Sequence, residues 1–339
     1  MSTVEANVEV AGVPEPRDHD LEVTAARDAR VGDMTVRRLL PLRLRRSVGA
    51  WCFVDHYGPL DTDGVTGMHV PPHPHIGLQT VTWLLRGTVV HRDSLGSEQL
   101  IRPGQLNLMT AGRGIAHAEE SMTADSRPVE PGPVPGLARA EPDPVLHGVQ
   151  LWVALPDASR QVAPAFEHHA ELPTGRLGGF DVTVLAGALG GANDASEPPV
   201  MTSPATAFSP IVGAELTAAR WPASYALPLR PDFEHVVFVA AGQAAIADVA
   251  LAPGQLLYLP AGRERCELSA AVDSTVFLLG GVPLREQLLM WWNFVARTPD
   301  EIAAAAADWR AGNFGPVYGG GDPLATPPLD LLRLRRPPT

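Results

Sequence analysis

The chain has 339 residues, 45% of them hydrophobic, and a formal net charge of −12 at pH 7. A chain of this length exceeds the size at which one hydrophobic core usually keeps growing, so two domains are expected. The acidic balance argues against nucleic acids and anionic membranes as direct partners, because both are bound through positively charged surfaces.

Membrane insertion, secretion and disulfide bonds are not expected. No run of about 18 apolar residues is present, and acidic residues stand near the start where a signal peptide would be basic, so we expect a cytoplasmic protein. Cys52 and Cys266 lie far apart without a partner at metal-binding spacing, so both are predicted to be small buried hydrophobes. Every basic residue is arginine, which favours a GC-rich and hence bacterial genome.

Short alternating or apolar segments separated by glycine and proline dominate the first half of the chain. Residues 77–93 and 98–112 are the clearest strand pairs, with the turn sequence SLGS between them, and residues 150–156 and 180–189 continue the pattern. This pattern is typical of antiparallel sandwiches and barrels. Residues 126–144 are rich in proline and lack periodicity, which predicts an exposed insertion, and residues 190–199 are similar.

The second half repeats the first in weaker form. RPGQLNLMTAGRG around Pro103–Gly112 matches APGQLLYLPAGRE around Pro253–Gly262, and such an internal repeat predicts a duplicated barrel. Near the end, TPDEIAAAAADWRAG predicts a helix over about residues 298–311, because Thr298 and Glu301 form a capping box and Gly312 suits the stop.

Two pairs of polar residues carry the chemistry. His73 and His75 are two residues apart, as are His117 and Glu119, and at the strand period of two each pair points to one face. Two such pairs on adjacent strands of a barrel can surround one metal ion. Three neutral nitrogens and one carboxylate suit iron, manganese, nickel, copper or zinc rather than calcium or magnesium.

The remaining histidines are interpreted as ordinary surface or hydrogen-bonded residues, because a single histidine in a strand is rarely a ligand. His56, in FVDHYGP, is an alternative: it could support the ligands from behind. The ordinary group comprises His19, His69, His91, His147, His168, His169 and His235. The second repeat keeps only His235 where the first has two histidines, so it is expected to bind no metal.

At this point the chain resembles a known family. FVDHYGP, HPHIGLQTVTWLLRGTVVHRDSLG, PGQLNLMTAGRGIAHAEES, LHGVQLWVALP and GGVPLREQLLMWWNFVARTPDEI are similar to segments of the pirin family of bicupins, in the same order. The resemblance implies an all-β fold of two cupin-type barrels, the double-stranded β-helix, with a short C-terminal helix. We expect an N-terminal metal-binding cupin domain over residues 1–155 and a degenerate C-terminal cupin domain over residues 156–339.

In the pirin family the histidines of the HPH motif and the His and Glu of the HAE motif hold a divalent metal, usually iron. The resemblance carries these roles onto His73, His75, His117 and Glu119. Family members often continue HPHRGFET, whereas this chain has Gln79 where that glutamate stands. The carboxylate role is therefore expected to fall on Glu119 alone.

The family implies two classes of function. Some pirin-like proteins are quercetin 2,3-dioxygenases, which open the flavonol ring with dioxygen and release carbon monoxide. For that reaction Glu119 is the expected catalytic base for the flavonol 3-hydroxyl, with Fe(II) as the expected ion and Mn, Ni, Cu or Zn as alternatives. Others are metal-dependent, redox-sensitive regulators that bind a transcription factor or a metabolic enzyme.

Two features motivate the regulator hypothesis: the second barrel, which is expected to bind no metal, and arginine clusters that a protein partner could bind. Two segments alternate arginine with leucine, which predicts strands with a solvated arginine face. These arginines are Arg37, Arg38, Arg43, Arg45 and Arg46, and then Arg333, Arg335 and Arg336. The sequence favours the enzyme, with a flavonol-like aromatic substrate and O2, over the regulator.

Overall fold

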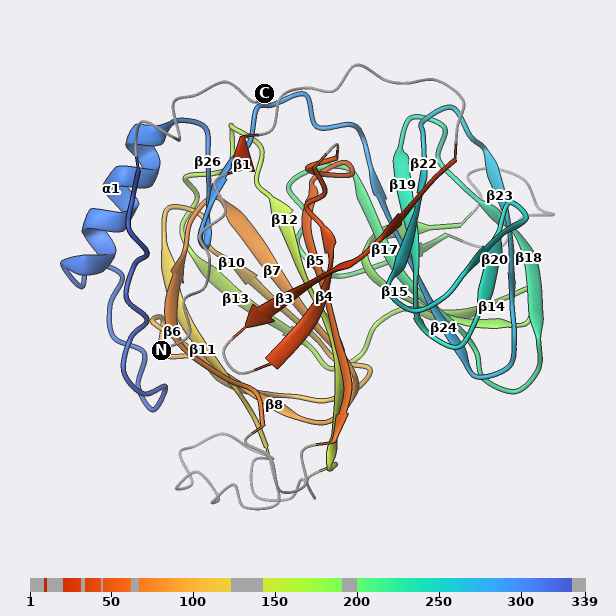
Figure 1. Cartoon of the computed structure of the whole chain (residues 1–339), viewed down its shortest axis with the longest axis horizontal. Helices are drawn as coiled ribbons and strands as arrows, with labels where there is room; N and C mark the ends of the chain where they lie inside the picture. Colours follow the sequence, from red (N-terminus) through yellow and green to blue (C-terminus); the bar gives the residue numbers. More distant parts are fainter. Residues whose placement is uncertain are drawn as a thin grey trace.

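Two β-barrels lie side by side and contain almost all of the secondary structure (Figure 1). The computed structural model describes residues 9–10, 21–31, 34–43, 45–61, 67–122, 143–190 and 200–330. Each barrel consists of two facing sheets, in which the paired strands of the described residues run antiparallel. The predicted all-β bicupin fold is confirmed, whereas His19 and most of the insertion at 126–144 lie outside the described residues.

The first barrel contains a seven-stranded sheet in the order β13-β10-β7-β12-β5-β4-β3 and a four-stranded sheet in the order β6-β11-β8-β9. The larger sheet is formed by β3 (Arg27–Val31), β4 (Met34–Leu40), β5 (Trp51–Asp61), β7 (Leu78–Arg86), β10 (Leu106–Thr110), β12 (Val145–Ala154) and β13 (Ala165–His169). The smaller sheet is formed by β6 (His69–His75), β8 (Val89–Asp93), β9 (Glu98–Ile101) and β11 (Ile115–Ser121).

The second barrel repeats this topology strand for strand. Its larger sheet has the order β14-β15-β17-β24-β19-β22-β2, with β16 paired to β15, and its smaller sheet has the order β18-β23-β20-β21. The strands are β2 (Glu22–Ala25), β14 (Thr174–Leu177), β15 (Phe180–Leu189), β16 (Met201–Thr202), β17 (Ile211–Ala218), β18 (Ala223–Pro228), β19 (Glu234–Ala241), β20 (Ala244–Ile246), β21 (Val249–Leu251), β22 (Gln255–Leu259), β23 (Arg265–Ala270) and β24 (Ser274–Gly281). The repeated Pro-Gly-Gln-Leu sequences lead into β10 and β22, which occupy matching places in the two sheets, so the predicted duplication is confirmed.

Several segments of the chain cross between the barrels. β2 precedes the strands of the first barrel, yet it pairs with β22 of the second, and β13 returns to pair with β10 of the first. β25 (Leu289–Trp291) and β26 (Phe294–Ala296) form a hairpin that joins β1 (Glu9–Val10) and then contacts the first barrel, where the Val295 amide donates to the Ile76 carbonyl at 3.1 Å. The last segments of the chain therefore help to build the wall of the first barrel.

The helix α1 (Pro299–Arg310) lies on the outer side of the first barrel, remote from the second (Figure 1). Thr298 caps it as predicted: its hydroxyl accepts from the Glu301 amide at 3.2 Å. Glu301 reaches back one residue further than a capping box does and accepts from the Arg297 amide at 3.0 Å. Gly312 follows the last turn with φ +75°, which terminates the helix. The described residues form no helix long and apolar enough to span a bilayer.

The barrels pack against each other through one apolar core. Side chains of the first barrel such as Trp51 meet side chains of the second such as Phe238 and Phe277, whose rings stack at 5.0 Å. The Trp51 indole N–H lies 3.1 Å from the carbonyls of both Val212 and Gly280 and so ties β5 to the second barrel. Cys52 and Cys266 are both buried free thiols, as predicted.

The contacts of the first arginine cluster differ from the solvated face that the sequence predicts. Arg38 forms a two-point ion pair with the buried Asp55, at 2.8 and 2.7 Å. The Arg45 guanidinium lies 3.1 Å from the centroid of the Tyr258 ring, which belongs to the second barrel. The predicted solvated face is therefore wrong for these arginines, which bind other parts of the fold. Residues 331–339, with the second cluster, lie outside the described part of the chain.

Strand alternation separates the two faces of the larger sheet. On β12, Val149 and Leu151 belong to the core between the barrels, whereas Gln150 and Trp152 line a cavity inside the first barrel. Side chains inside the second barrel, such as Phe180, Val237 and Leu268, are apolar and form a continuous core. The first barrel therefore encloses a cavity, whereas the second encloses a hydrophobic core.

Candidate metal centre

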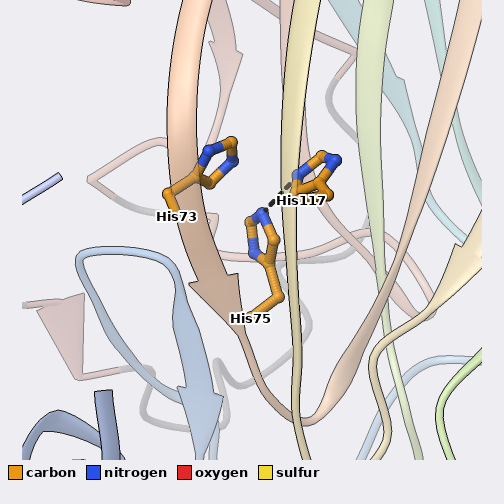
Figure 2. A group of neighbouring side chains, drawn as sticks. All are labelled: His73, His75 and His117. Carbon is orange, nitrogen blue, oxygen red and sulfur yellow. Dashed lines mark hydrogen bonds between the residues drawn. The ribbon is translucent and has the colours of Figure 1, made fainter. Parts of the chain in front are cut away.

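Two neighbouring strands bring three histidines together, as the spacing predicted. β6 supplies His73 and His75, and β11 supplies His117, which lies directly opposite His73 in the antiparallel register. Figure 2 shows the three rings converging between the two strands, with Nε2 of His75 3.1 Å from Nε2 of His117. One ring nitrogen from each histidine lies within 4.8 Å of the others, and all three side chains are buried.

Two of these rings are held at Nδ1 by backbone carbonyls. Nδ1 of His73 lies 2.9 Å from the Pro71 carbonyl, and Nδ1 of His75 lies 3.0 Å from the Asn293 carbonyl. A carbonyl only accepts hydrogen bonds, so both rings carry their proton on Nδ1 and present a lone pair at Nε2. These two rings are thus oriented to bind a metal ion through Nε2.

The spacing and charge state of the donors also fit a divalent metal. Two nitrogens at right angles about 2.1 Å from one ion would be about 3 Å apart, which agrees with the His75–His117 separation. Burial lowers the pKa of His73 to about 4 and lowers the pKa values of His75 and His117 well below the ordinary value. All three rings are therefore neutral at pH 7, as metal ligation requires.

These pKa shifts predict a flat pH dependence of metal binding. Protons compete with the metal only when the pH approaches the lowered histidine pKa values, or the pKa of Glu119, which burial raises from its usual value. We expect the dissociation constant to change less than about threefold between about pH 8 and about pH 6. Equilibrium dialysis against Zn(II) at both pH values measures it, and a steep loss near pH 6.5 would indicate exposed, ordinary histidines instead.

Glu119 follows His117 on β11 after a bulge in the pairing with β6. It forms a second close group with His91 and His117, whose ligand atoms also lie within 4.8 Å of one another. The Thr82 hydroxyl donates to its Oε1 at 2.9 Å and lies 3.0 Å from Oε1 of Gln150. The structure therefore gathers the four predicted residues at one place, in two groups that share His117.

His91 was missed, since its sequence context looked ordinary. It becomes part of the centre only because β8 pairs with β11, placing His91 opposite Glu119. The alternative that His56 supports the ligands is wrong. Its Nε2 lies 2.8 Å from Nε2 of His147, and within the described part of the chain it forms no hydrogen bond to a residue of the metal groups. Gln79 also points elsewhere, because its amide donates to Thr110 and to the Thr206 carbonyl, both at 3.0 Å.

His73, His75, His117 and Glu119 line a cavity of about 170 Å³. Its walls are largely apolar and aromatic: Phe53 and Trp152 stack at 4.1 Å, and Trp152 meets the edge of His75 at 5.1 Å. The β25–β26 hairpin adds Trp292, whose φ of +52° is unusual for a bulky residue. Further lining residues include Met34, Met68, Met290 and Leu324, with Arg27, Arg30 and Arg38 among the polar ones.

Comparison with known proteins decides the family. The pirin model matches residues 33–153, and the model of the pirin C-terminal cupin domain matches residues 218–315. A Pseudomonas aeruginosa protein provisionally named quercetin 2,3-dioxygenase is 41% identical over 320 residues, which are 93% of each chain. This chain belongs to the pirin family.

Other relatives of this pirin cover nearly its whole length. A pirin-like protein of Caulobacter vibrioides is 37% identical over 297 residues, 85% of this chain and 92% of that protein. The crystal structure described as quercetin 2,3-dioxygenase from Acinetobacter baumannii matches with a TM-score of 0.78 at 36% identity and covers 91% of this pirin and 96% of that chain. The match to the Acinetobacter structure therefore spans both barrels.

Proposed function

We propose that this pirin is a metal-dependent dioxygenase that opens the ring of flavonols such as quercetin with O2 and releases carbon monoxide. The observation that carries the proposal is the buried group of three histidines, two of which present Nε2, beside a carboxylate at an aromatic-walled cavity. The names of the relatives from Pseudomonas aeruginosa and Acinetobacter baumannii support the substrate class.

His73, His75, His117 and Glu119 are the proposed ligands of one divalent ion, with Fe(II) as the proposed native metal. Such an ion supplies Lewis acidity, which lowers the pKa of a coordinated hydroxyl, and an open position for dioxygen chemistry. The histidines hold the ion through Nε2, and their Nδ1 contacts fix the ring orientations. They have no free proton site and therefore do not act as acid or base while ligated.

Glu119 is the proposed catalytic base for the flavonol 3-hydroxyl. Burial raises its pKa, against the effect of nearby His91 and the hydrogen bond from Thr82, so the carboxylate is a stronger base than an exposed one. Thr82 holds Oε1 by its hydroxyl, so the other carboxylate oxygen would either bind the ion or, with Glu119 swung off it, accept the proton. The proton thus moves from the substrate oxygen to a buried carboxylate.

The cavity walls support a flat aromatic substrate. Phe53 and Trp152 form one stacked surface beside the histidines, and Trp292 comes from the C-terminal hairpin. Aromatic faces bind planar rings with an interaction of about 0.5–1.5 kcal/mol beyond the burial of their area. Of the two features that motivate the regulator hypothesis, the arginine cluster is weakened, because Arg38 and Arg45 are engaged with Asp55 and Tyr258 inside the fold.

An anaerobic titration with quercetin tests the proposal. Iron-loaded protein is expected to shift the flavonol absorption band on binding and to bleach it when air is admitted. It should release one carbon monoxide for each flavonol that is bleached. Protein freed of metal by a chelator is the matched control and should show none of these effects. If the loaded protein leaves the band unchanged and unbleached, flavonols are not its substrates.

A further inference from the structure

His117 differs from the other two metal-group histidines in what holds its Nδ1 atom. His73 and His75 are held by backbone carbonyls, whereas Nδ1 of His117 faces Nδ1 of His91 at 3.4 Å. An imidazole nitrogen can donate or accept, so this contact does not by itself decide which nitrogen of His117 bears the proton. The proton position of His117 must therefore be decided by a group on the far side of His91.

Asp93 lies on the far side of His91. The Oδ2 atom of Asp93 is 3.4 Å from Nε2 of His91, and both side chains are only 2% exposed. Both 3.4 Å separations are at the long end of the hydrogen-bond range. The other carboxylate oxygen, Oδ1, accepts from the amides of Leu95 and Ser97, each at 2.9 Å, so the SLGS turn fixes which oxygen faces His91.

The ring of His91 is fixed from a third direction. Phe166 on β13 stacks on it with a centroid separation of 4.5 Å and an interplanar angle of 17°. His91 is therefore oriented by the turn through Asp93, by Phe166 across its face, and by His117 at its remaining nitrogen. This arrangement is more than an ordinary buried histidine needs to satisfy its hydrogen bonds.

We propose that Asp93 and His91 form a positioning relay that places the proton of His117 on Nδ1 and so frees its Nε2 for the metal. This inference rests on the metal centre of the proposed function. A carboxylate accepts only, so His91 carries its proton on Nε2 and presents a lone pair at Nδ1. That lone pair accepts from Nδ1 of His117, which leaves the Nε2 lone pair of His117 facing His75.

Asp93→Asn is the sharpest test, because it keeps the shape and reverses the relay. The amide oxygen of the asparagine stays with the two turn amides, since turning it away would lose two hydrogen bonds to gain one. Its NH2 group then donates to Nε2 of His91, so His91 carries its proton on Nδ1 and His117 carries its proton on Nε2. The metal-binding nitrogen of His117 is thereby blocked.

The matched variant is Asp93→Ala, which removes the turn contacts but leaves His91 free to keep either proton position. We expect Asp93→Asn to weaken Zn(II) binding in equilibrium dialysis by about 10- to 100-fold, while Asp93→Ala weakens it by less than about fivefold. In urea unfolding of the metal-free proteins, the order reverses, and Asp93→Ala has the lower midpoint. A purely structural role for Asp93 predicts instead that Asp93→Ala is the worse variant in both measurements.

Nitrogen-15 NMR of the histidine rings in the metal-free protein reads the proton positions directly. The wild type is expected to show His117 protonated at Nδ1, and Asp93→Asn to show it protonated at Nε2. The same proton position in both proteins, or weaker Zn(II) binding by Asp93→Ala than by Asp93→Asn, would overturn the relay. The NMR experiment uses metal-free protein and so tests the relay separately from the proposed function. A wild type that binds no metal would contradict the proposed function alone.

Discussion

Replacing His75 by alanine is expected to weaken metal binding by more than about 100-fold, because it removes a ligand rather than a residue behind one. His75 is 1% exposed, and its Nε2 is the atom that faces His117 at 3.1 Å. With two histidines left, the ion loses one of its three proposed neutral nitrogen donors. Metal analysis after gel filtration, with far-UV circular dichroism to confirm the fold, measures the effect.

His69→Ala is the control for this variant. His69 lies on the same strand, but its side chain is 46% exposed and its ring lies 4.0 Å from Glu120 at the surface. It should retain the wild-type metal content. If His75→Ala also retained it, the three-histidine assignment would be wrong.

Glu119→Gln is expected to separate metal binding from turnover. The single oxygen of the amide can still coordinate the ion weakly, and the three histidines are unchanged, so most of the metal should remain. An amide cannot take up the proton of the flavonol hydroxyl, so the rate of bleaching should fall by about 10²- to 10⁴-fold. Single-turnover absorbance measurements on protein with matched metal content give the comparison.

Thr82→Val offers a milder companion change. It removes the hydroxyl that holds Oε1 of Glu119 without touching the carboxylate itself, so the rate should fall less than in Glu119→Gln. Full activity in Glu119→Gln would remove Glu119 from the proton-transfer role and leave it as a ligand alone.

Much of the fold could be predicted because strand patterns and turn residues are local. The SLGS turn, the strand at 180–189 and the capped helix all appear where the sequence placed them. The exchange of β2 and β13 between the barrels could not be predicted, since strand pairing across such distances leaves no local pattern. The arginines were misjudged for the same reason: Tyr258, which Arg45 covers, is more than 200 residues away in the chain.

The site could be predicted only where its residues share a strand. The two-residue spacing of His73 and His75, and of His117 and Glu119, indicates a common face, and the structure places both pairs on adjacent strands. His91 and the carbonyl of Asn293 join the centre through the pairing of β8 with β11 and through the C-terminal hairpin. Neither contact follows from spacing, because both depend on tertiary register.

Anomalous diffraction from crystals of the metal-loaded protein locates the ion directly. For the proposed metal centre we expect one peak per chain, bounded by the Nε2 atoms of His73, His75 and His117 and by the carboxylate of Glu119, with metal–nitrogen distances of about 2.1 Å. A peak between His91, His117 and Glu119 on the Nδ1 side of His117, or no peak in the first barrel, would contradict it.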